Sequence, residues 1–373
     1  MRTLTEKANI GLTREAIEGF HMTDLFSPVR LGAYTLNNRL AMAPMTRSRA
    51  NADGSPTPLM AEYYAQRASL GIILTEATQP SDIGQGAIST PGIYTDAHVD
   101  NWRQVTSAVH AKGGHIFIQI MHSGRMAHPD NVIGNLQAVA PSAIAPRLKF
   151  HTANGAKDVP VPREMNLEEI RQTIADFRYT ARRAIDAGAD GVEIHGANGY
   201  LLQQFLAPNA NLRTDAYGGS IQNRARLAIE VANAVVEEIG AERTGFRVSP
   251  GGLLGDLDEG AEGPALYRYL VSELDKLGLA FLDVMHWGNE ELLTDLRKLW
   301  HRTLILNRPG RLRDQFGTDV AAGLADIESY GSMALANPDF VHRLRTSAPF
   351  NQADKATFYG GNARGYTDYP TLA

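Results

Sequence analysis

The stretch "NLEEIRQTIADFRYTARRAIDAGADGVEIH", residues 166–195, contains one complete helix–turn–strand unit. Apolar residues recur at three- and four-residue steps through 166–188, which predicts an amphipathic helix. Gly188 stands where a left-handed helix C-cap is needed. The apolar run at 190–195 then has the length and composition of a buried strand. This unit therefore predicts a fold in which helices and strands alternate.

The same alternation extends over most of the chain. Strand-like runs stand at 39–45, 71–77, 115–121, 190–195, 244–250, 280–285, 303–307 and 325–331. Helical patterns between them stand at 58–69, 99–113, 166–188, 221–240, 264–278, 290–300 and 311–323, the last interrupted by Gly317. Eight strands that alternate with helices predict an α/β fold, a (β/α)₈ TIM barrel. A doubly wound sheet is the rival, but the first strand runs into "PMTRSRA" and lacks the glycine-rich fingerprint of that fold.

Three segments stand outside this alternation. Residues 29–39, "VRLGAYTLNNR", predict a hairpin that closes the bottom of the barrel. Residues 122–165 form a long insertion after the third strand, and we expect a lid or subdomain over the barrel mouth. Residues 1–21 are expected to be an N-terminal extension, possibly flexible, before a single barrel domain at 22–373.

The composition of the chain excludes several classes of partner and of chemistry. The 373 residues carry a net charge of −5 without a basic block, so neither nucleic acid nor an anionic membrane is an expected partner. The absence of cysteine excludes disulfides, cysteine-ligated clusters and thiolate nucleophiles. The chain has neither an apolar run of membrane-spanning length nor a secretory signal core in its first 21 residues. We expect a cytoplasmic protein, either a monomer or a homo-oligomer.

The catalytic face of such a barrel lies at the C-terminal ends of its strands. The side chains expected there are mostly neutral hydrogen-bonding groups with one inward arginine, Arg247. They lack the carboxylate pair of a glycosidase and any spacing typical of a metal site, so no metal is expected. Such a set suits a heteroaromatic cofactor, with flavin as the natural candidate. Gln119 can pair with a pyrimidine-like edge, and Arg247 can stabilise negative charge at the N1/O2 edge of a reduced ring.

Several longer motifs carry a family resemblance. "LAMAPMTRSRA", "IQIMHSGR", "FRVSP", "ALANPDF", "FYGGNARGYTDYP" and above all residues 192–227, "VEIHGANGYLLQQFLAPNANLRTDAYGGSIQNRARL", resemble the Old Yellow Enzyme family. The resemblance runs from about residue 23 to the C-terminus. It implies an FMN-dependent enzyme that uses NAD(P)H to reduce activated alkenes such as enones, maleimides and nitroalkenes.

The resemblance also implies a role for each matching position. His195 and Asn198 would bind the oxygen of the substrate's electron-withdrawing group, and Tyr200 would donate the proton that complements hydride from flavin N5. Tyr359 and Met121 would border the substrate. The cofactor-binding positions would be Pro44, Met45, Thr46, Ala77, Gln119, Arg247, Asn307, Arg308, Gly331 and Ser332.

Three positions depart from the family pattern. Met121 stands where a tryptophan is usual, which would change the tuning of the flavin and soften the substrate wall, and Ala87 stands where some relatives have a tyrosine, which would widen the pocket. At the phosphate end, Ser332 replaces the usual arginine, and Pro309 in the preceding turn has no N–H to donate. Either Arg308 or Arg311 supplies the missing charge, or both face solvent.

Two other functions stay open from the sequence. The chain could be a flavin enzyme of a biosynthetic pathway that performs dehydrogenation or isomerisation. It could also be a flavin- or ligand-binding protein of low turnover, because of the altered phosphate end.

Overall fold

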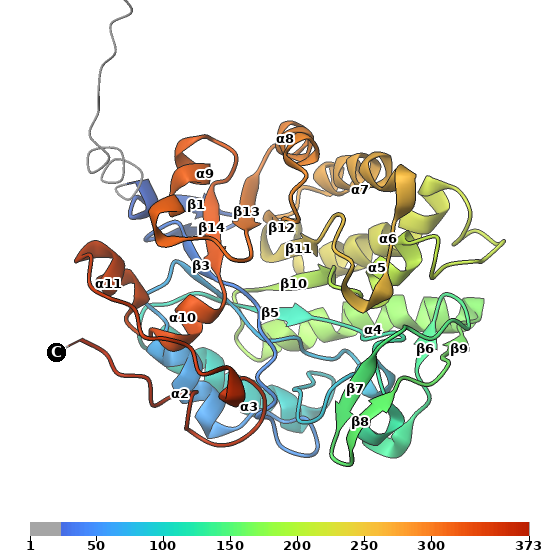
Figure 1. Ribbon diagram of the computed structural model, residues 1–373, viewed down its shortest axis with the longest axis horizontal. Helices are drawn as coiled ribbons and strands as arrows, with labels where there is room; N and C mark the ends of the chain where they lie inside the picture. The colour runs from blue at the N-terminus through green and yellow to red at the C-terminus, as the bar shows by residue number, and fades with distance from the viewer. Residues whose placement is uncertain (1–23, 373) are drawn as a thin grey trace, which may run out of the picture.

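The computed structural model describes residues 24–372, and its centre is a closed barrel of eight parallel strands (Figure 1). Each predicted strand is present, and the predicted barrel is confirmed. The strands are β3 (Leu40–Met42), β4 (Ile72–Leu74), β5 (Ile116–Ile120), β10 (Gly191–Gly196), β11 (Thr244–Val248), β12 (Phe281–Met285), β13 (Thr303–Asn307) and β14 (Ile327–Tyr330).

Helices surround this barrel, as Figure 1 shows. Those that connect successive strands are α2 (Pro58–Gln66), α3 (Asp96–His110), α4 (Leu167–Asp186), α6 (Ile221–Ile239), α7 (Gly263–Leu277), α8 (Glu290–Leu299) and α9 (Thr318–Ala321). Three further helices are short: α5 (Leu201–Leu206) follows β10, α10 (Ser332–Ala336) follows β14, and α11 (Phe340–Arg345) follows α10.

The predicted helix at 311–323 is wrong in its extent. Only α9 is α-helical there, after a single 3₁₀ turn at Arg313–Gln315. Gly317 lies between them with a φ of 79°, a left-handed conformation that a continuous helix cannot contain. The glycine therefore divides the segment and leaves a loop beside the barrel mouth.

The unit at 166–195 folds as its sequence predicts. The side chain of Asn166 accepts a hydrogen bond from the Glu169 N–H, and the Glu169 side chain accepts one from the Asn166 N–H, which is a capping box. At the other end of α4, Gly188 has a φ of 84°, so the chain reverses into β10 without strain from a Cβ atom. Local signals thus set both the start and the end of this helix.

The N-terminal hairpin closes the bottom of the barrel, as predicted. Strands β1 (Val29–Leu31) and β2 (Tyr34–Leu36) pair antiparallel. Leu31 and Leu36 are fully buried in a cluster with apolar side chains from the lower ends of the barrel strands. The Tyr34 hydroxyl donates to the Asp190 carbonyl oxygen at 3.0 Å, which ties the hairpin to the start of β10.

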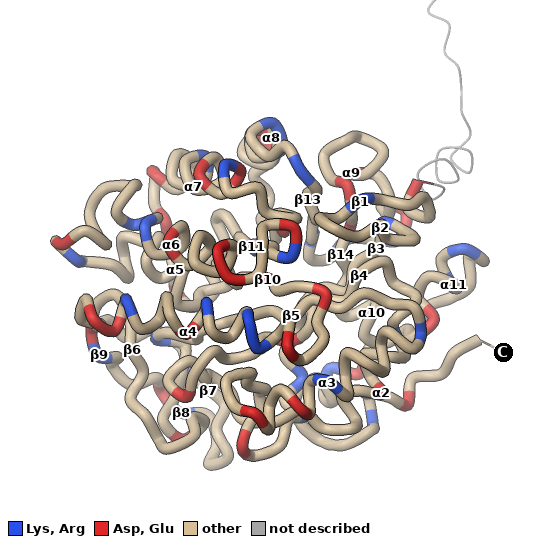
Figure 2. Tube along the Cα trace, turned by 180° about the vertical axis from the view of Figure 1, so that it is seen from behind, with Lys and Arg blue, Asp and Glu red and all other residues tan. Residues whose placement is uncertain are grey.

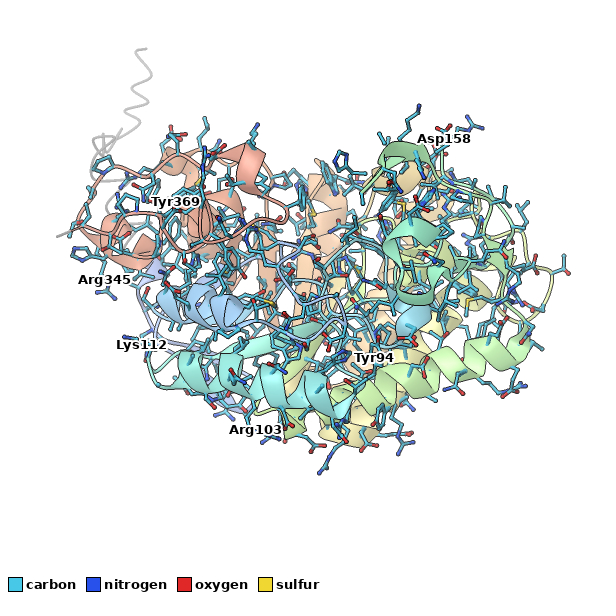
Figure 3. The ribbon with its side chains drawn as sticks, turned by 90° about the horizontal axis from the view of Figure 1, so that it is seen from below. Tyr94, Arg103, Lys112, Asp158, Arg345 and Tyr369 are labelled. Atoms are coloured by element: carbon cyan, nitrogen blue, oxygen red, sulfur yellow. The ribbon has the colours of Figure 1, made fainter. Side chains whose placement is uncertain are left out.

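The insertion after β5 has its own small structure at the opposite end of the barrel. It contains a two-stranded pair, β6 (Val139–Ala140) with β9 (Arg163–Glu164), and a hairpin, β7 (Lys149–Thr152) with β8 (Gly155–Asp158). Figure 3 labels Asp158 at the end of this hairpin and Arg345 of α11 at the far side of the molecule. The predicted insertion is confirmed, whereas its action as a lid stays a prediction. The predicted extension at 1–21 lies outside the described residues.

The helices of the described chain do not combine the length and apolarity needed to cross a membrane. Figure 2 shows basic and acidic segments interspersed over the outer helices. This mixed surface contrasts with the inside of the barrel, where arginines and carboxylates such as Arg247 and Asp283 are buried.

Candidate active site

Two adjoining cavities open at the C-terminal ends of the barrel strands. The first, of about 850 Å³, is called the wide cavity below, and the second, of about 380 Å³, the narrow cavity. Both volumes lie in the range of small-molecule sites. The two cavities share the segment Pro44–Thr46 after β3, together with Asn198 and Tyr359.

All the predicted site residues line one cavity or the other. The wide cavity is lined by Pro44, Met45, Thr46, Ala77, Gln119, Met121, His195, Asn198, Tyr200 and Tyr359, and also by Ala87. The narrow cavity adds Arg247, Asn307, Arg308, Gly331 and Ser332. The barrel therefore brings residues from seven strand ends into one continuous site, while their individual roles stay predictions.

The end of β10 and the turn after it place three polar side chains, His195, Asn198 and Tyr200, at the wide cavity. Asn198 has a φ of 55°, and its N–H donates to Ser249 Oγ at 2.9 Å. Gly199 follows with a φ of 84°, and a Cβ atom there would lie 2.5 Å from the Leu254 carbonyl oxygen. A glycine is therefore required at this position. The tight turn brings the Tyr200 ring centroid to 5.4 Å from that of His195.

His195 is neutral in this environment. Burial lowers its pKa well below the ordinary value, and the positive charge of Arg247 lowers it further. The Gln119 side-chain amide donates to His195 Nδ1 at 3.2 Å. Nδ1 is therefore the acceptor nitrogen, and Nε2 carries the proton. His195 can act as a hydrogen-bond donor without carrying a charge.

Tyr200 also keeps its proton at neutral pH. Burial raises the pKa of its phenol to about 12, and Tyr359 adds to the effect. A phenol with this pKa is a proton donor, not an anion, under physiological conditions. Asn198 lines the same cavity, where its side-chain amide can donate through Nδ2 and its buried Oδ1 has no partner among the described groups.

Arg247 of β11 lines the narrow cavity. It is 2% exposed and forms an ion pair with the fully buried Asp283 of β12. Its Nε atom is buried and has no hydrogen-bond partner among residues 24–372. An unpaired buried donor is costly, so a ligand acceptor beside Arg247 would stabilise the site.

The C-terminal segment reaches the site because two arginines hold its backbone. Arg47 Nε donates to the Phe358 carbonyl oxygen at 2.9 Å, and Arg49 Nη2 donates to that of Thr357 at 3.0 Å. Tyr366 stacks on Tyr63 of α2 with ring centroids 4.0 Å apart. These contacts place Tyr359 beside both cavities.

Two of the arginines that line the narrow cavity, Arg308 and Arg311, are engaged with carboxylates. Arg308 Nε and Nη2 donate to the two oxygens of Asp319 at 2.9 and 3.0 Å. Its Nη1 and Nη2 also donate to the two oxygens of Glu290, at 2.6 and 2.9 Å, and Nη1 lies 3.0 Å from His286 Nδ1. The five N–H groups of a guanidinium are thus all used.

Arg311 is more deeply buried in the same cluster. Its side chain, 5% exposed, forms ion pairs with Asp319 and with Glu328 of β14. The side chain of Arg308 is 22% exposed. The alternative that both arginines face solvent is therefore wrong. Buried Asp319 forms ion pairs with both side chains, and buried Glu328 forms one with Arg311.

The sequence reasoning missed several acidic residues of the site. Glu193 and Asp283 lie inside the barrel below the wide cavity, and Glu290, Asp319 and Glu328 hold the two arginines of the narrow one. A usable signal was present for the first two, since each is a lone carboxylate within an apolar strand. Glu290 and Asp319 resemble ordinary surface charges in the sequence, so no comparable signal exists for them.

Among the described residues no group of three or more His, Asp or Glu side chains is placed to hold a metal ion.

Comparison with known proteins places this site in context. The model of the NADH:flavin oxidoreductase / NADH oxidase family matches residues 24–351. A probable flavin mononucleotide-dependent alkene reductase of Leishmania infantum is 42% identical over 368 residues, which cover 93% of this chain and 97% of the relative. 12-Oxophytodienoate reductase 2 of Arabidopsis thaliana is 39% identical over 363 residues, which cover 93% and 96%.

Solved structures agree with the sequence matches. The old yellow enzyme homologue from Zymomonas mobilis superposes with a TM-score of 0.89 at 40% identity, covering 94% of this chain and 100% of that chain. Morphinone reductase in complex with tetrahydroNAD superposes with a TM-score of 0.89 at 41% identity, covering 94% and 98%.

Proposed function

Because this chain belongs to the Old Yellow Enzyme family of NADH:flavin oxidoreductases, we propose that it uses FMN and NAD(P)H to reduce activated alkenes in the wide cavity. The names of relatives as alkene and 12-oxophytodienoate reductases support this substrate class. The observation that carries the proposal is the set of neutral donors, His195, Asn198 and Tyr200, gathered at one wall of that cavity.

The residues present fit a flavin. FMN, when bound, would accept two electrons from NAD(P)H and deliver them with a proton to the alkene. Gln119 and Arg247 would hold the polar edge of the ring, and the orphaned Arg247 Nε supports an acceptor there. The other residues that would hold the ring are Pro44, Met45, Thr46 and Ala77, which line the wide cavity together with Gln119.

His195 and Asn198 would bind the carbonyl or nitro oxygen of the substrate. Both can donate a hydrogen bond, and neither needs to change its charge to do so. Negative charge develops on that oxygen as the alkene β-carbon is reduced. Two fixed donors in a partly buried site stabilise this charge by the logic of an oxyanion hole. Met121 and Tyr359 would border the rest of the substrate.

Tyr200 would protonate the α-carbon. Its pKa of about 12 keeps the proton on the phenol in the resting protein. The phenol would transfer this proton once negative charge has developed at the α-carbon. The ring lies beside His195, so the acid would reach the α-carbon while the donors hold the oxygen, which is two bonds away in the same substrate.

For the phosphate of FMN, we propose Arg308 as the cation that takes the place of the missing arginine at Ser332. Asp319 is buried and orients the guanidinium through two hydrogen bonds, whereas the side chain of Glu290 is 60% exposed. Glu290 can therefore turn to solvent at small cost, because exposed ion pairs contribute little. Arg308 would then contact the phosphate together with Asn307, Gly331 and Ser332, which line the same cavity.

The proposal is tested by the absorption spectrum of the purified protein, its anaerobic reduction by NADPH and NADH, and its reoxidation by an enone, a maleimide and a nitroalkene. We expect a flavin spectrum, bleaching by the nicotinamide and recovery by at least one alkene. A protein that takes up no FMN would overturn the proposal, and so would a reduced flavin that none of the alkenes reoxidises.

A flavin-binding protein of low turnover is the second candidate. The observation that favours it is the pairing of Arg308 and Arg311 with carboxylates, which leaves neither of these two guanidinium groups free for a phosphate. Slow reoxidation by all three alkenes in a protein that binds FMN tightly would favour this candidate.

A cytoplasmic location and the oligomeric state stay predictions.

A further inference from the structure

We propose that Glu193 and Asp283 share one proton beneath the active site, so that together with Arg247 they form a neutral trio. This trio sets the charge that the protein presents to the polar edge of the flavin. The inference rests on the proposed function for its consequence, whereas the shared proton can be tested in the protein without flavin.

The strand register brings these side chains together inside the barrel. On β10, Glu193 lies beside Gln119 of β5, and His195 lies beside Arg247 of β11. On β12, Asp283 lies beside Arg247. Glu193 and Asp283 are 0% exposed, so water cannot solvate either carboxyl group. Two ionised carboxylates in such a place would be strongly unfavourable.

The hydrogen bonds show which oxygens lack a partner. Glu193 Oε1 accepts from Gln119 Nε2 at 2.7 Å, and Asp283 Oδ2 accepts from Arg247 Nη1. Glu193 Oε2 and Asp283 Oδ1 are both buried without a partner among the described groups. Two ionised oxygens cannot satisfy each other, because both are acceptors. One proton between them gives each oxygen a partner.

The proton belongs on Glu193. Burial raises the pKa of Glu193 well above the ordinary value, and the negative charge of Asp283 raises it further. Asp283 keeps its charge because it forms the direct ion pair with Arg247. The remaining contacts of Glu193, to Gln119 and to Asp283, suit a neutral carboxylic acid that accepts one hydrogen bond and donates one.

The charge count has a consequence for the flavin. Reduction places negative charge at the ring edge that Arg247 would contact, so an uncompensated arginine would favour the reduced form. Asp283 cancels this charge within the barrel, and neutral Glu193 adds none. The trio therefore holds the reduction potential of the flavin below the value that a lone Arg247 would produce.

Two variants separate these contributions. Glu193→Gln replaces a neutral acid with a neutral amide that can still accept from Gln119 and donate to Asp283. Glu193→Gln/Asp283→Asn removes the remaining negative charge and leaves Arg247 uncompensated. Each is reconstituted with FMN, and the midpoint potential is measured against a reference dye.

We expect the single variant to keep the wild-type potential. The double variant should shift it upward by at least about 30 mV, which is a ten-fold gain in preference for reduced flavin for a two-electron couple. An upward shift of equal size in the single variant would mean that Glu193 is ionised and would overturn the proposal. No shift in the double variant would overturn the coupling to the flavin.

A second measurement keeps the proposal testable if the double variant does not fold. The infrared spectrum of the wild-type protein without flavin should contain a carboxylic acid C=O band at neutral pH that Glu193→Gln removes. If no such band is lost, the shared proton is wrong. Failure of the proposed function would appear differently, as the absence of flavin binding in every variant while the infrared band remains.

Discussion

The wide cavity and the part of the narrow cavity around Arg308 and Arg311 use polar groups in opposite ways. In the wide cavity, His195 and Tyr200 are neutral, and the buried Oδ1 of Asn198 has no partner among the described groups. These side chains can therefore form further hydrogen bonds. In the narrow cavity, Arg308 and Arg311 are charged, and each is paired with buried or half-buried carboxylates. Spare capacity marks the place where a ligand can be recognised without rearrangement. A closed set of ion pairs must open before it can bind an anion.

The largest effect is expected from Tyr200→Phe, which tests whether the wide cavity holds a proton donor. Loss of a positioned general acid should slow alkene reduction by about 10²- to 10³-fold. Reduction of the flavin by NADPH should stay within about two-fold, because no proton from Tyr200 is needed there. Stopped-flow measurement of each half-reaction checks this, with Tyr179→Phe on the exposed face of α4 as the matched control. Equal losses in both half-reactions would contradict the donor role.

The pH dependence of the same step sharpens this test. The raised pKa of Tyr200, about 12, means that the phenol holds its proton at all lower pH values. The alkene half-reaction should therefore be level between pH 7 and about pH 10 and decline only as the pH approaches that value. A decline centred near the ordinary tyrosine value would show that Tyr200 is not buried as described.

His195→Ala and Asn198→Ala should each have a somewhat smaller effect. Each removes one of two donors to the substrate oxygen, so kcat/KM for an enone should fall by about 10- to 100-fold. The double variant should lose less than the product of the two single losses, because the donors share one acceptor. Steady-state kinetics with the enone measures this cycle. Fully multiplicative losses would argue against a common oxygen.

Arg308→Ala tests the narrow cavity, with an expected effect of about ten-fold. If Arg308 exchanges Glu290 for the phosphate, the variant should bind FMN about ten-fold more weakly and riboflavin with unchanged affinity. Glu290→Gln should tighten FMN binding by a few fold, because it removes the competing carboxylate. Quenching of flavin fluorescence measures both ligands.

Arg302→Ala is a matched control on an exposed arginine that contacts Asp275 instead, and it should change neither affinity. Equal weakening of FMN and riboflavin in Arg308→Ala would show that the residue supports the fold and does not contact phosphate.

The smallest effect is expected from Met121→Trp, which narrows the wide cavity. The larger ring should lower kcat/KM for a bulky enone several-fold while that for a small one changes little, since it fills space without removing a polar group. Ala87→Tyr at the same cavity should act in the same direction. A loss of similar size for both substrates would show that these side chains do not set the width of the pocket.

Much of this molecule could be predicted from local patterns. All eight strands were found because buried parallel strands are short apolar runs, and the helices between them carry a clear 3.6-residue period. The helix at 311–323 was overestimated, because periodicity alone does not show that Gly317 adopts a left-handed conformation. The positions of the site could be predicted because the strand ends of a barrel converge. The carboxylates that pair with the arginines of the site could not be predicted.

The sequence by itself determined the strand order, the ends of helices with clear caps such as α4, and the residues that meet at the barrel mouth. Each of these depends on neighbours close in the chain or on one general property of barrels. Only the tertiary structure decided the charge states. Glu193 and Asp283 are 90 residues apart yet face each other inside the barrel, and Arg308 meets Glu290 from the preceding strand–helix unit. Burial and pairing between distant residues set these charges, and neither is written in local sequence.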